Sequence, residues 1–381
     1  IVAAGTYTEQ VEIAKNITLE GAGSSTVIES PLELTTCFTV AAPNCPIVYV
    51  HDVDAVTIRD LVVDGAGRGQ ATCRFHGLGL HNAGGTVEDV DIQDVRHEPL
   101  TAAEGGAGIY LYNDDGISRS ITVGDSRISR FQKNGLALRA SDTTPLTVDI
   151  RGNQIEGAGV LTYDNGEPVQ NGIEVWADRG TGSVADNTIR GIAYDNTNDC
   201  ERYVASSILN LYADLDVTGN SVSGGQVGLY TVAGAVQVRD NAFEIDKVGV
   251  AAFGIVARGE RMGDGTPDTD RTDHMESFGL GMFASDPPDA VASPLGEPGG
   301  GGRGLEMASL EASTLDVTVL GNTIALADAL ITDTFGIEAY AGDGPDDMAL
   351  TVRSNTVTGF GVGIDIRTCE TDCSTGVFNR V

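Results

Sequence analysis

The stretch GIEVWADRGTGSVADNTI, residues 172–189, contains both short patterns on which the fold prediction depends. The first, GIEVW, follows a glycine with apolar residues at alternate positions, which is typical of a β-strand with one buried face. The second, ADNTI, places an asparagine two residues before an isoleucine, at the end of another short strand. Neither pattern has the 3.6-residue periodicity of an amphipathic helix, so we expect no helices between the strands.

Both patterns recur along the chain. The asparagine pattern returns as RGNQI (151–155), TGNSV (218–222), RDNAF (239–243), LGNTI (320–324) and RSNTV (353–357). The glycine-led pattern returns as GLGLH (77–81), GIYLY (108–112), GLALR (135–139), GLYTV (228–232), GIVAR (254–258), GIEAY (336–340) and GIDIR (363–367). Such repeats predict a parallel β-helix of about ten coils, in which the aliphatic positions stack into one core. A β-sandwich is the main competitor, but its strands would not share an asparagine register.

The recurring asparagine has two interpretations. Side-chain amides at the same turn of successive coils can hydrogen-bond to one another and form a ladder. Alternatively, asparagine is used because it tolerates a left-handed backbone at turns. Both interpretations predict one domain over 1–381, interrupted by a Gly-, Pro- and Asp-rich insertion at 259–314 that is either a lid or a solvated, disordered segment.

Charge and composition exclude several classes of partner. The chain has 55 acidic and 23 basic residues, a formal net charge of −32, which disfavours nucleic acids and anionic membranes as partners. No apolar run is long enough to span a bilayer. The close cysteine pairs Cys37/Cys45 and Cys369/Cys373 lie in loop-like contexts where short disulfides can form. We therefore expect a secreted or cell-surface protein, extracellular or periplasmic, that acts as a monomer.

One segment carries a family resemblance. AGTYTEQVEIAKNITLEGAGSSTVI (4–28) resembles the first coil of the right-handed parallel β-helix superfamily that includes pectin methylesterases and pectate lyases. The repeats resemble that superfamily across about residues 50–368. The resemblance implies a polysaccharide groove along one outer sheet, and enzymes predominate among its members. The active-site motifs of polygalacturonases, pectate lyases and pectin methylesterases are not found, so no residue role is transferred.

Alternation along the glycine-led strands predicts which side chains face outward. One predicted outward column contains Tyr49, Gly79, Tyr110, Ala137, Glu174, Asn210, Tyr230, Val256, Glu338 and Asp365. The other contains His51, His81, Tyr112, Arg139, Trp176, Tyr212, Val232, Arg258, Tyr340 and Arg367. Flat rings interspersed with charged groups suit a sugar-binding groove, although aromatic pairs also simply stabilise sheets. The predicted substrate-binding residues are His81, Tyr110, Tyr112, Trp176, Tyr212, Tyr230 and Tyr340.

Carboxylates follow these strands and suggest glycoside hydrolysis. Asp114 and Asp178 are the predicted catalytic pair, with Glu174 as a third candidate, because glycosidases use two carboxyl groups about 5–9.5 Å apart. Crowding of such acids raises the pKa of a proton donor. Turn chemistry explains the same aspartates without catalysis. No cofactor is required, although Asp114, Asp115 and Asp142 form a weak candidate Ca²⁺ site.

Two further functions stay open at this point. His81, Tyr112 and Arg139 lie on consecutive coils and form a base, acid and cation set for β-elimination of a uronate, with or without calcium. The net charge of the chain disfavours an anionic substrate unless calcium bridges the two. The other alternative is a non-catalytic glycan-binding or adhesive β-helix.

Overall fold

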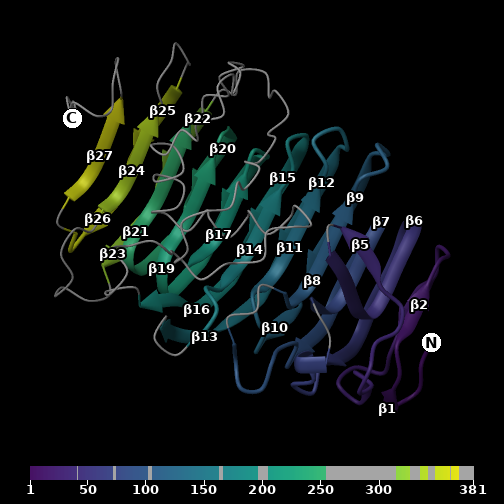
Figure 1. Ribbon diagram of the computed structural model, residues 1–381. Coiled ribbons are helices and arrows are strands. Elements are labelled where there is room, and N and C mark those ends of the chain that lie inside the picture. Colours follow the sequence, from purple (N-terminus) through teal and green to yellow (C-terminus); the bar gives the residue numbers. More distant parts are fainter. Residues whose placement is uncertain are drawn as a thin grey trace, which may run out of the picture.

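A computed structural model describes residues 1–381 except 41, 72–73, 102–104, 163–165, 196–204, 255–314, 327–334, 342–347, 361 and 369–381. The described chain is all-β apart from the short 3-10 helix η1 (Gly69–Ala71). Its strands stack in parallel, coil after coil, from the purple N-terminal end to the yellow C-terminal end (Figure 1). The fold is a parallel β-helix, and the predicted all-β solenoid is confirmed.

Each coil runs through three faces, named here the first, second and third sheets. The first sheet, which carries the predicted outward columns, stacks β2 (Val11–Ile13), β6 (Ala42–Asp64), β7 (Phe75–Gln93), β8 (Ala107–Asn113), β11 (Asn134–Ala140), β14 (Asn171–Trp176), β17 (Ser206–Leu211), β19 (Ser221–Val232), β21 (Ala242–Gly254), β24 (Phe335–Ala341) and β27 (Val362–Thr368). The long strands β6 and β7 bend through all three sheets.

The other two sheets complete the coils. Besides parts of β6 and β7, the second sheet contains β3 (Thr18–Glu20), β9 (Arg119–Gly124), β12 (Leu146–Arg151), β15 (Gly180–Ala185), β18 (Asp214–Thr218), β20 (Gly234–Arg239), β22 (Leu315–Leu320) and β25 (Met348–Arg353). Besides parts of β6, β7, β19 and β21, the third contains β1 (Gly5–Thr8), β4 (Thr26–Glu29), β10 (Arg127–Ser129), β13 (Gln154–Thr162), β16 (Thr188–Asp195), β23 (Thr323–Leu326) and β26 (Thr356–Thr358).

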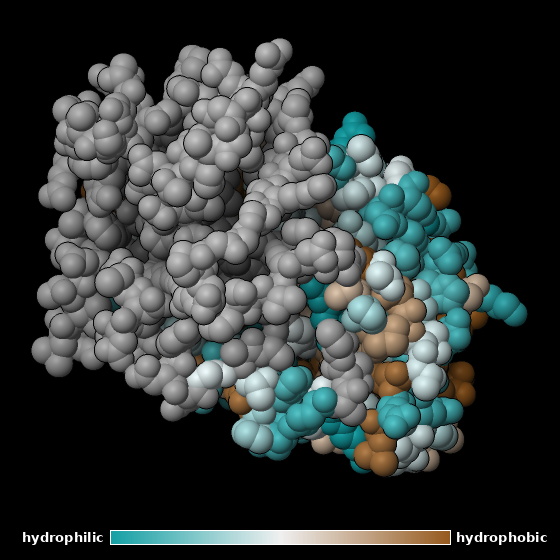
Figure 2. Space-filling view, viewed as in Figure 1, coloured by the Kyte–Doolittle hydropathy of each residue, from teal (hydrophilic) through white to brown (hydrophobic). Residues whose placement is uncertain are grey.

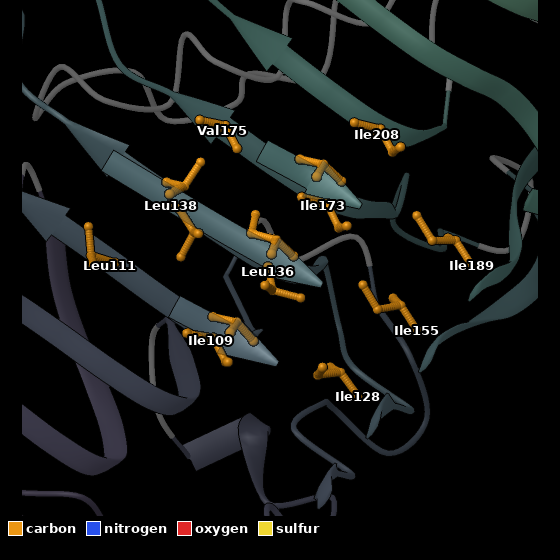
Figure 3. Packing of buried hydrophobic residues seen from close by; sticks show 14 of the residues in the cluster. Ile109, Leu111, Ile128, Leu136, Leu138, Ile155, Ile173, Val175, Ile189 and Ile208 are labelled. Carbon is orange, nitrogen blue, oxygen red and sulfur yellow. The ribbon is translucent and has the colours of Figure 1, made fainter. Parts of the chain in front are cut away.

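The core consists of stacked aliphatic side chains inside the coils. In Figure 3, Ile109, Leu136, Ile173 and Ile208 follow one another from β8 to β17, facing Ile128, Ile155 and Ile189 from the third sheet. All of these side chains have at most 1% exposure. Burying each one contributes about 1.5–3 kcal/mol relative to an exposed position. The alternation of apolar and other residues in the sequence therefore predicts correctly which side chains face the core along this part of the chain.

The asparagine pattern forms a chain of hydrogen bonds at the start of the third sheet. Each side-chain Nδ2 donates to the Oδ1 of the next asparagine at 2.9 Å, in the order Asn153, Asn187, Asn220, Asn241, Asn322 and Asn355. The backbone residue with positive φ is the one before the asparagine, such as Asp186 (56°) or Gly219 (69°). The alternative interpretation, in which the asparagine itself takes the left-handed conformation, is therefore wrong for these positions.

Strand β5 (Phe38–Val40) differs from the other described strands because it pairs antiparallel, with the start of β6. A disulfide joins Cys37 to Cys45 across this hairpin, as the loop-like sequence suggested. The other predicted pair, Cys369 and Cys373, lies outside the described residues, as does the predicted insertion at 259–314.

The described surface is mixed in polarity. On the face shown in Figure 2, hydrophobic residues are interspersed with hydrophilic ones over the coloured part. Large apolar residues with high exposure, among them Leu32, Ile117 and Val160, come from distant parts of the sequence. Within the described ranges, no helix is long and apolar enough to cross a bilayer.

Candidate functional site on the first sheet

The second outward column is in register over its first five members. His51, His81, Tyr112, Arg139 and Trp176 are successive partners in the parallel ladder from β6 to β14. All five side chains are partly accessible to solvent. In this column, the aromatic rings of Tyr112 and Trp176 therefore lie on either side of the Arg139 guanidinium group.

The predicted position of Tyr212 in this column is wrong. Trp176 pairs with Leu211, the last residue of β17, so Tyr212 lies beyond the strand, with a φ of 72°. The pattern slips by one residue because Asn210 faces inward opposite Val175, where its Nδ2 donates to the carbonyl of Ala213 and to the Thr231 hydroxyl. The sequence pattern predicts that Asn210, a polar residue, faces outward. In the structure its amide N–H groups are hydrogen-bonded inside the coil.

The first outward column is also correct as far as Glu174, and then continues with Leu209 and Tyr230. However, Tyr110 is 5% exposed and Tyr230 is 3% exposed. Neither ring is available as an open platform, so the prediction of exposed sugar-binding rings at these two positions is wrong. Tyr110 is covered because the rings of Phe38 and His76 stack against it, with centroids 5.9 and 4.6 Å away.

Tyr340 is placed by backbone register alone. It pairs with Phe253 of β21 and Arg367 of β27, which is the second outward column. Arg258, assigned to that column from the sequence, lies outside the described residues, and Phe253 holds its position. The slip arises because β21 begins its outward alternation five residues earlier than the GIVAR pattern suggested.

Glu174 is not on an open groove floor. Its side chain is 1% exposed, its Oε1 accepts from Arg139 Nε at 2.5 Å, and its Oε2 accepts from Asn134 Nδ2 at 2.9 Å. The Arg139 guanidinium carbon lies 5.3 Å from the centroid of the Trp176 ring and 5.8 Å from that of Tyr110. Glu174 therefore holds Arg139 against the two aromatic rings, and both carboxylate oxygens are engaged.

A narrow pocket lies beside this ion pair, lined in part by His76, Asn134 and Glu174. Its free volume of about 30 Å³ holds one or two waters and is too small for a sugar ring. Burial, with smaller effects from Arg74 and Arg139, lowers the pKa of His76 to about 3. The neutral ring donates from Nε2 to Asn44 and accepts the Ala107 N–H at Nδ1, so it has no free nitrogen for proton transfer.

Asp178 follows Trp176 by two residues, at the end of β14. Burial, followed by the charge of Asp142, raises the pKa of the Asp178 carboxyl above its usual value. Burial, with a smaller effect from Asp178, also raises the pKa of Tyr212 to about 12. Asp142, Asp178 and Tyr212 each follow one of three successive first-sheet strands, close enough for Asp142 to affect Asp178 and for Asp178 to affect Tyr212. A carboxyl group with a raised pKa keeps its proton to a higher pH, which suits a general acid.

Asp114 has different neighbours. Its Oδ1 accepts from Asn82 Nδ2 at 2.9 Å, its backbone N–H donates to Asn82 Oδ1 at 2.8 Å, and His81 Nε2 lies 3.6 Å from Oδ1. These contacts are those of a turn aspartate bonded to the preceding coil. The described contacts therefore tie Asp114 to His81 and Asn82, whereas Asp178 interacts with Asp142.

The weak calcium set does not assemble. Both carboxylate oxygens of Asp115 accept from the guanidinium of Arg119, which lowers the pKa of Asp115. Arg119 is itself buried and also bonds to Asp54. In the part of the chain that the structure describes, no three His, Cys, Asp or Glu side chains lie close enough to hold a metal ion.

Sequence reasoning missed Phe38, His76 and Asn134. The signal for Asn134 was present: the dipeptide NG begins both β11 and β14, and Asn171 Nδ2 lies 3.4 Å from Asn134 Oδ1 in a short second asparagine stack. Phe38 follows Cys37 directly, but its partners are between 11 and 72 residues away in sequence. Only the folded hairpin brings it onto the sheet.

Comparison with known proteins adds fold-level likenesses. No family model and no curated sequence matches the chain. Two similar solved structures are the A-modules of the Azotobacter vinelandii mannuronan C-5 epimerases AlgE4 and AlgE6. The AlgE4 module is 16% identical with a TM-score of 0.40, and the match covers 97% of this chain and 89% of that one. The AlgE6 module is 14% identical with a TM-score of 0.34, and the match covers 94% of this chain and 89% of that one. A third is the catalytic domain of a GH87 α-1,3-glucanase in complex with nigerose. It is 11% identical with a TM-score of 0.34, and the match covers 95% of this chain and 62% of that one.

Proposed function

We propose that the protein is an extracellular carbohydrate-active enzyme that cleaves a polysaccharide by two-carboxylate glycoside hydrolysis. Asp178 is the proton donor, and Asp142, whose charge raises the pKa of Asp178, supplies the second carboxylate. Trp176 and Tyr112 bind the faces of sugar rings, and Arg139 between them bonds to hydroxyl groups. The observation that carries the proposal is the placement of Asp178, a half-buried carboxyl affected by the charge of Asp142, two residues after the partly exposed Trp176.

The mechanism follows from this arrangement. A glycosidic oxygen leaves only when it receives a proton, and burial keeps Asp178 protonated at higher pH than an exposed aspartate. Glu174 takes the role of a positioning residue, because it fixes the guanidinium of Arg139 beside the Trp176 ring. Asp114 is no longer proposed as the partner of Asp178, since its contacts are with Asn82 and His81.

A panel of neutral and uronate polysaccharides tests the proposal. We expect new reducing ends without absorbance at 235 nm, and a loss of about 10²–10⁴-fold in rate for Asp178→Asn. Asp214→Asn is the matched control: Asp214 is exposed, starts β18, and accepts one bond from the Ala235 N–H. Equal rates for the wild type and Asp178→Asn would remove Asp178 from the mechanism. Binding without any product would indicate a glycan-binding β-helix.

One observation favours a second function, β-elimination of a uronate. His81, Tyr112 and Arg139 are successive partners in register, as that reaction would need. Against it, the Arg139 guanidinium already bonds to Glu174, so its charge is shared with a carboxylate of the protein. Products that absorb at 235 nm, lost in Tyr112→Phe but retained in Asp178→Asn, would support elimination over hydrolysis.

A further inference from the structure

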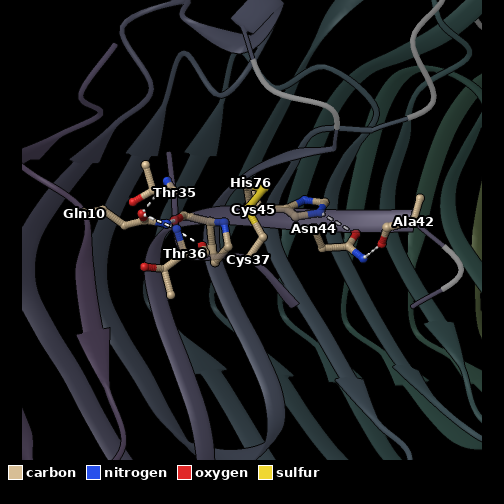
Figure 4. The surroundings of a disulfide bond; sticks show 9 residues. Gln10, Thr35, Thr36, Cys37, Ala42, Asn44, Cys45 and His76 are labelled. Carbon is tan, nitrogen blue, oxygen red and sulfur yellow. Dashed lines mark hydrogen bonds between the residues drawn. A yellow bond between two sulfur atoms is a disulfide. The ribbon is translucent and has the colours of Figure 1, made fainter. Parts of the chain in front are cut away.

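The β5 hairpin, residues 35–40 and 42–46, is fixed onto the outside of the coils. The Cys37–Cys45 disulfide joins its two sides, with Cα atoms 4.3 Å apart. The side chain of Gln10 makes four hydrogen bonds of 2.7–3.0 Å to its backbone, accepting from the N–H groups of Thr35 and Thr36 and donating to the carbonyls of Thr36 and Pro46. Figure 4 shows Gln10, the disulfide and the Asn44–His76 bond along this hairpin.

The hairpin places Phe38 against the outer side of the first sheet. Its ring stacks against Tyr49 with centroids 5.4 Å apart and planes 8° apart, and against His81 at 4.7 Å and 10°. Gly79, between Tyr49 and Tyr110 in the ladder, leaves room for the hairpin, because a Cβ there would lie 2.6 Å from Pro46 and 3.4 Å from the Phe38 ring. Phe38 is 5% exposed, so the packing is close.

The covered part of the sheet adjoins the proposed sugar-binding face. Phe38 lies over the outward side chains of β6, β7 and β8, where Tyr49 and Tyr110 are buried. In the second outward column, Tyr112 of β8, Arg139 of β11 and Trp176 of β14 stay partly accessible. An aromatic ring stacked on other rings occupies the kind of position that a sugar face would take. A glycan that lies over Trp176 and Tyr112 therefore meets Phe38 and the hairpin at the N-terminal end of this face.

We propose that Phe38 closes the sugar-binding face at this end, so that the protein binds the end of a glycan chain rather than its middle. The terminal sugar lies at Tyr112 and abuts Phe38, and the chain continues over Arg139 to Trp176, two rungs or about 9.6 Å further along. The ligand class is an oligo- or polysaccharide with an unsubstituted end. This inference rests on the proposed function, and cleavage beside Asp178 then releases short products of uniform length.

Trp176 fluorescence tests this without requiring cleavage, because the chain has one tryptophan. Oligosaccharides of increasing length and their parent polymers, from glucan, xylan, mannan, alginate and polygalacturonate, are titrated into the wild type, Phe38→Ala and Thr39→Ala. Thr39 lies in the same hairpin with its side chain exposed, so it is the matched control. We expect the wild type and the control to have an affinity per mole of chains that does not change with polymer length. Phe38→Ala is expected to bind the longest polymer about tenfold more tightly per chain.

A second variant guards against misfolding of Phe38→Ala. Replacing Cys37 and Cys45 together by serine frees the hairpin without creating a cavity under it, and circular dichroism confirms that each variant is folded. The proposal is overturned if the affinity of the wild type per mole of chains rises with polymer length. It is also overturned if Phe38→Ala and the double serine variant are folded and still bind with an affinity that does not depend on length. If no glycan changes the fluorescence of any variant and no product forms, the proposed function itself fails, and this inference falls with it.

Discussion

Arg139 donates a 2.5 Å hydrogen bond from Nε to Oε1 of Glu174, from one first-sheet strand to the next. Glu174 is almost fully buried and also accepts a bond from Asn134, so removing the guanidinium takes away the ion-pair partner of a buried charge. We therefore expect Arg139→Met to lower the free energy of unfolding by about 3 kcal/mol, the cost of breaking a buried pair. Urea denaturation followed by circular dichroism measures it.

The double variant Arg139→Met with Glu174→Met is the control for this prediction. It removes both charges and keeps apolar volume, so much of the lost stability should return. If the single and double variants are equally unstable, the loss comes from packing against Tyr110 and Trp176 and not from an unpaired carboxylate.

Carbon-13 titration of side-chain carboxyl groups tests the environment of Asp178. Its pKa should exceed that of an exposed aspartate, about 3.9. Asp142→Asn should lower this pKa only in part, because burial is the larger cause and remains. A full return to the ordinary value would mean that Asp142 alone raises it. Since the folded-state pKa is raised, this carboxyl favours the folded state below its unfolded pKa and loses that contribution as pH rises through the folded pKa.

His51 joins the first coil to the second. Its Nε2 lies 2.9 Å from Glu12 of β2 and its Nδ1 lies 2.8 Å from Asp52. Burial lowers the pKa of His51, but the hydrogen bonds to Asp52 and Glu12 outweigh it, so the pKa is raised. The charged His51 therefore stabilises the folded state fully below the unfolded pKa of His, about 6.5. This stabilisation is lost as pH rises through the higher pKa of the folded state.

Hydrogen exchange of β2 measures this effect. The backbone amides of β2 should exchange faster at pH 8.5 than at pH 5.5 after correction for intrinsic rates. In His51→Gln, which cannot carry the charge, that difference should disappear. If it persists in the variant, another group controls the docking of the first coil.

Asn220 is an internal member of the asparagine chain. Its Oδ1 accepts from the N–H and Nδ2 of Asn187, and its Nδ2 donates to Val184 O and Asn241 Oδ1. Asn220→Ala leaves several buried groups without partners, so we expect a loss of about 2–4 kcal/mol in the free energy of unfolding. Asn355→Ala, at the half-buried end of the chain, is the matched control and should cost less. Equal losses would contradict a cooperative chain.

The glycine-led pattern was sufficient to predict the core and both outward columns as far as Trp176, because period-two alternation fixes the face of each side chain. It failed at Asn210, where no glycine marks the strand and a polar residue faces inward. One residue of slip was enough to move Tyr212 out of the column.

Burial of the tyrosines was beyond pattern reasoning for a different reason. Tyr110 is covered by Phe38, and that contact depends on a hairpin that folds back onto the sheet. Likewise, the pairing of Glu174 with Arg139 required the register of neighbouring coils, since the two residues are 35 positions apart. The pKa of Asp178 depends on burial, which alternation does not report beyond a strand end.

Asn241 and Asn322 are 81 residues apart, yet their side chains bond at 2.9 Å, as do Asn220 and Asn241, which are 21 residues apart. The spacing of the coils is thus independent of the length of chain that connects them. The connection between β21 and β22 is therefore a natural site for grafting a foreign peptide or a small domain, because the coils on either side of it stay in register.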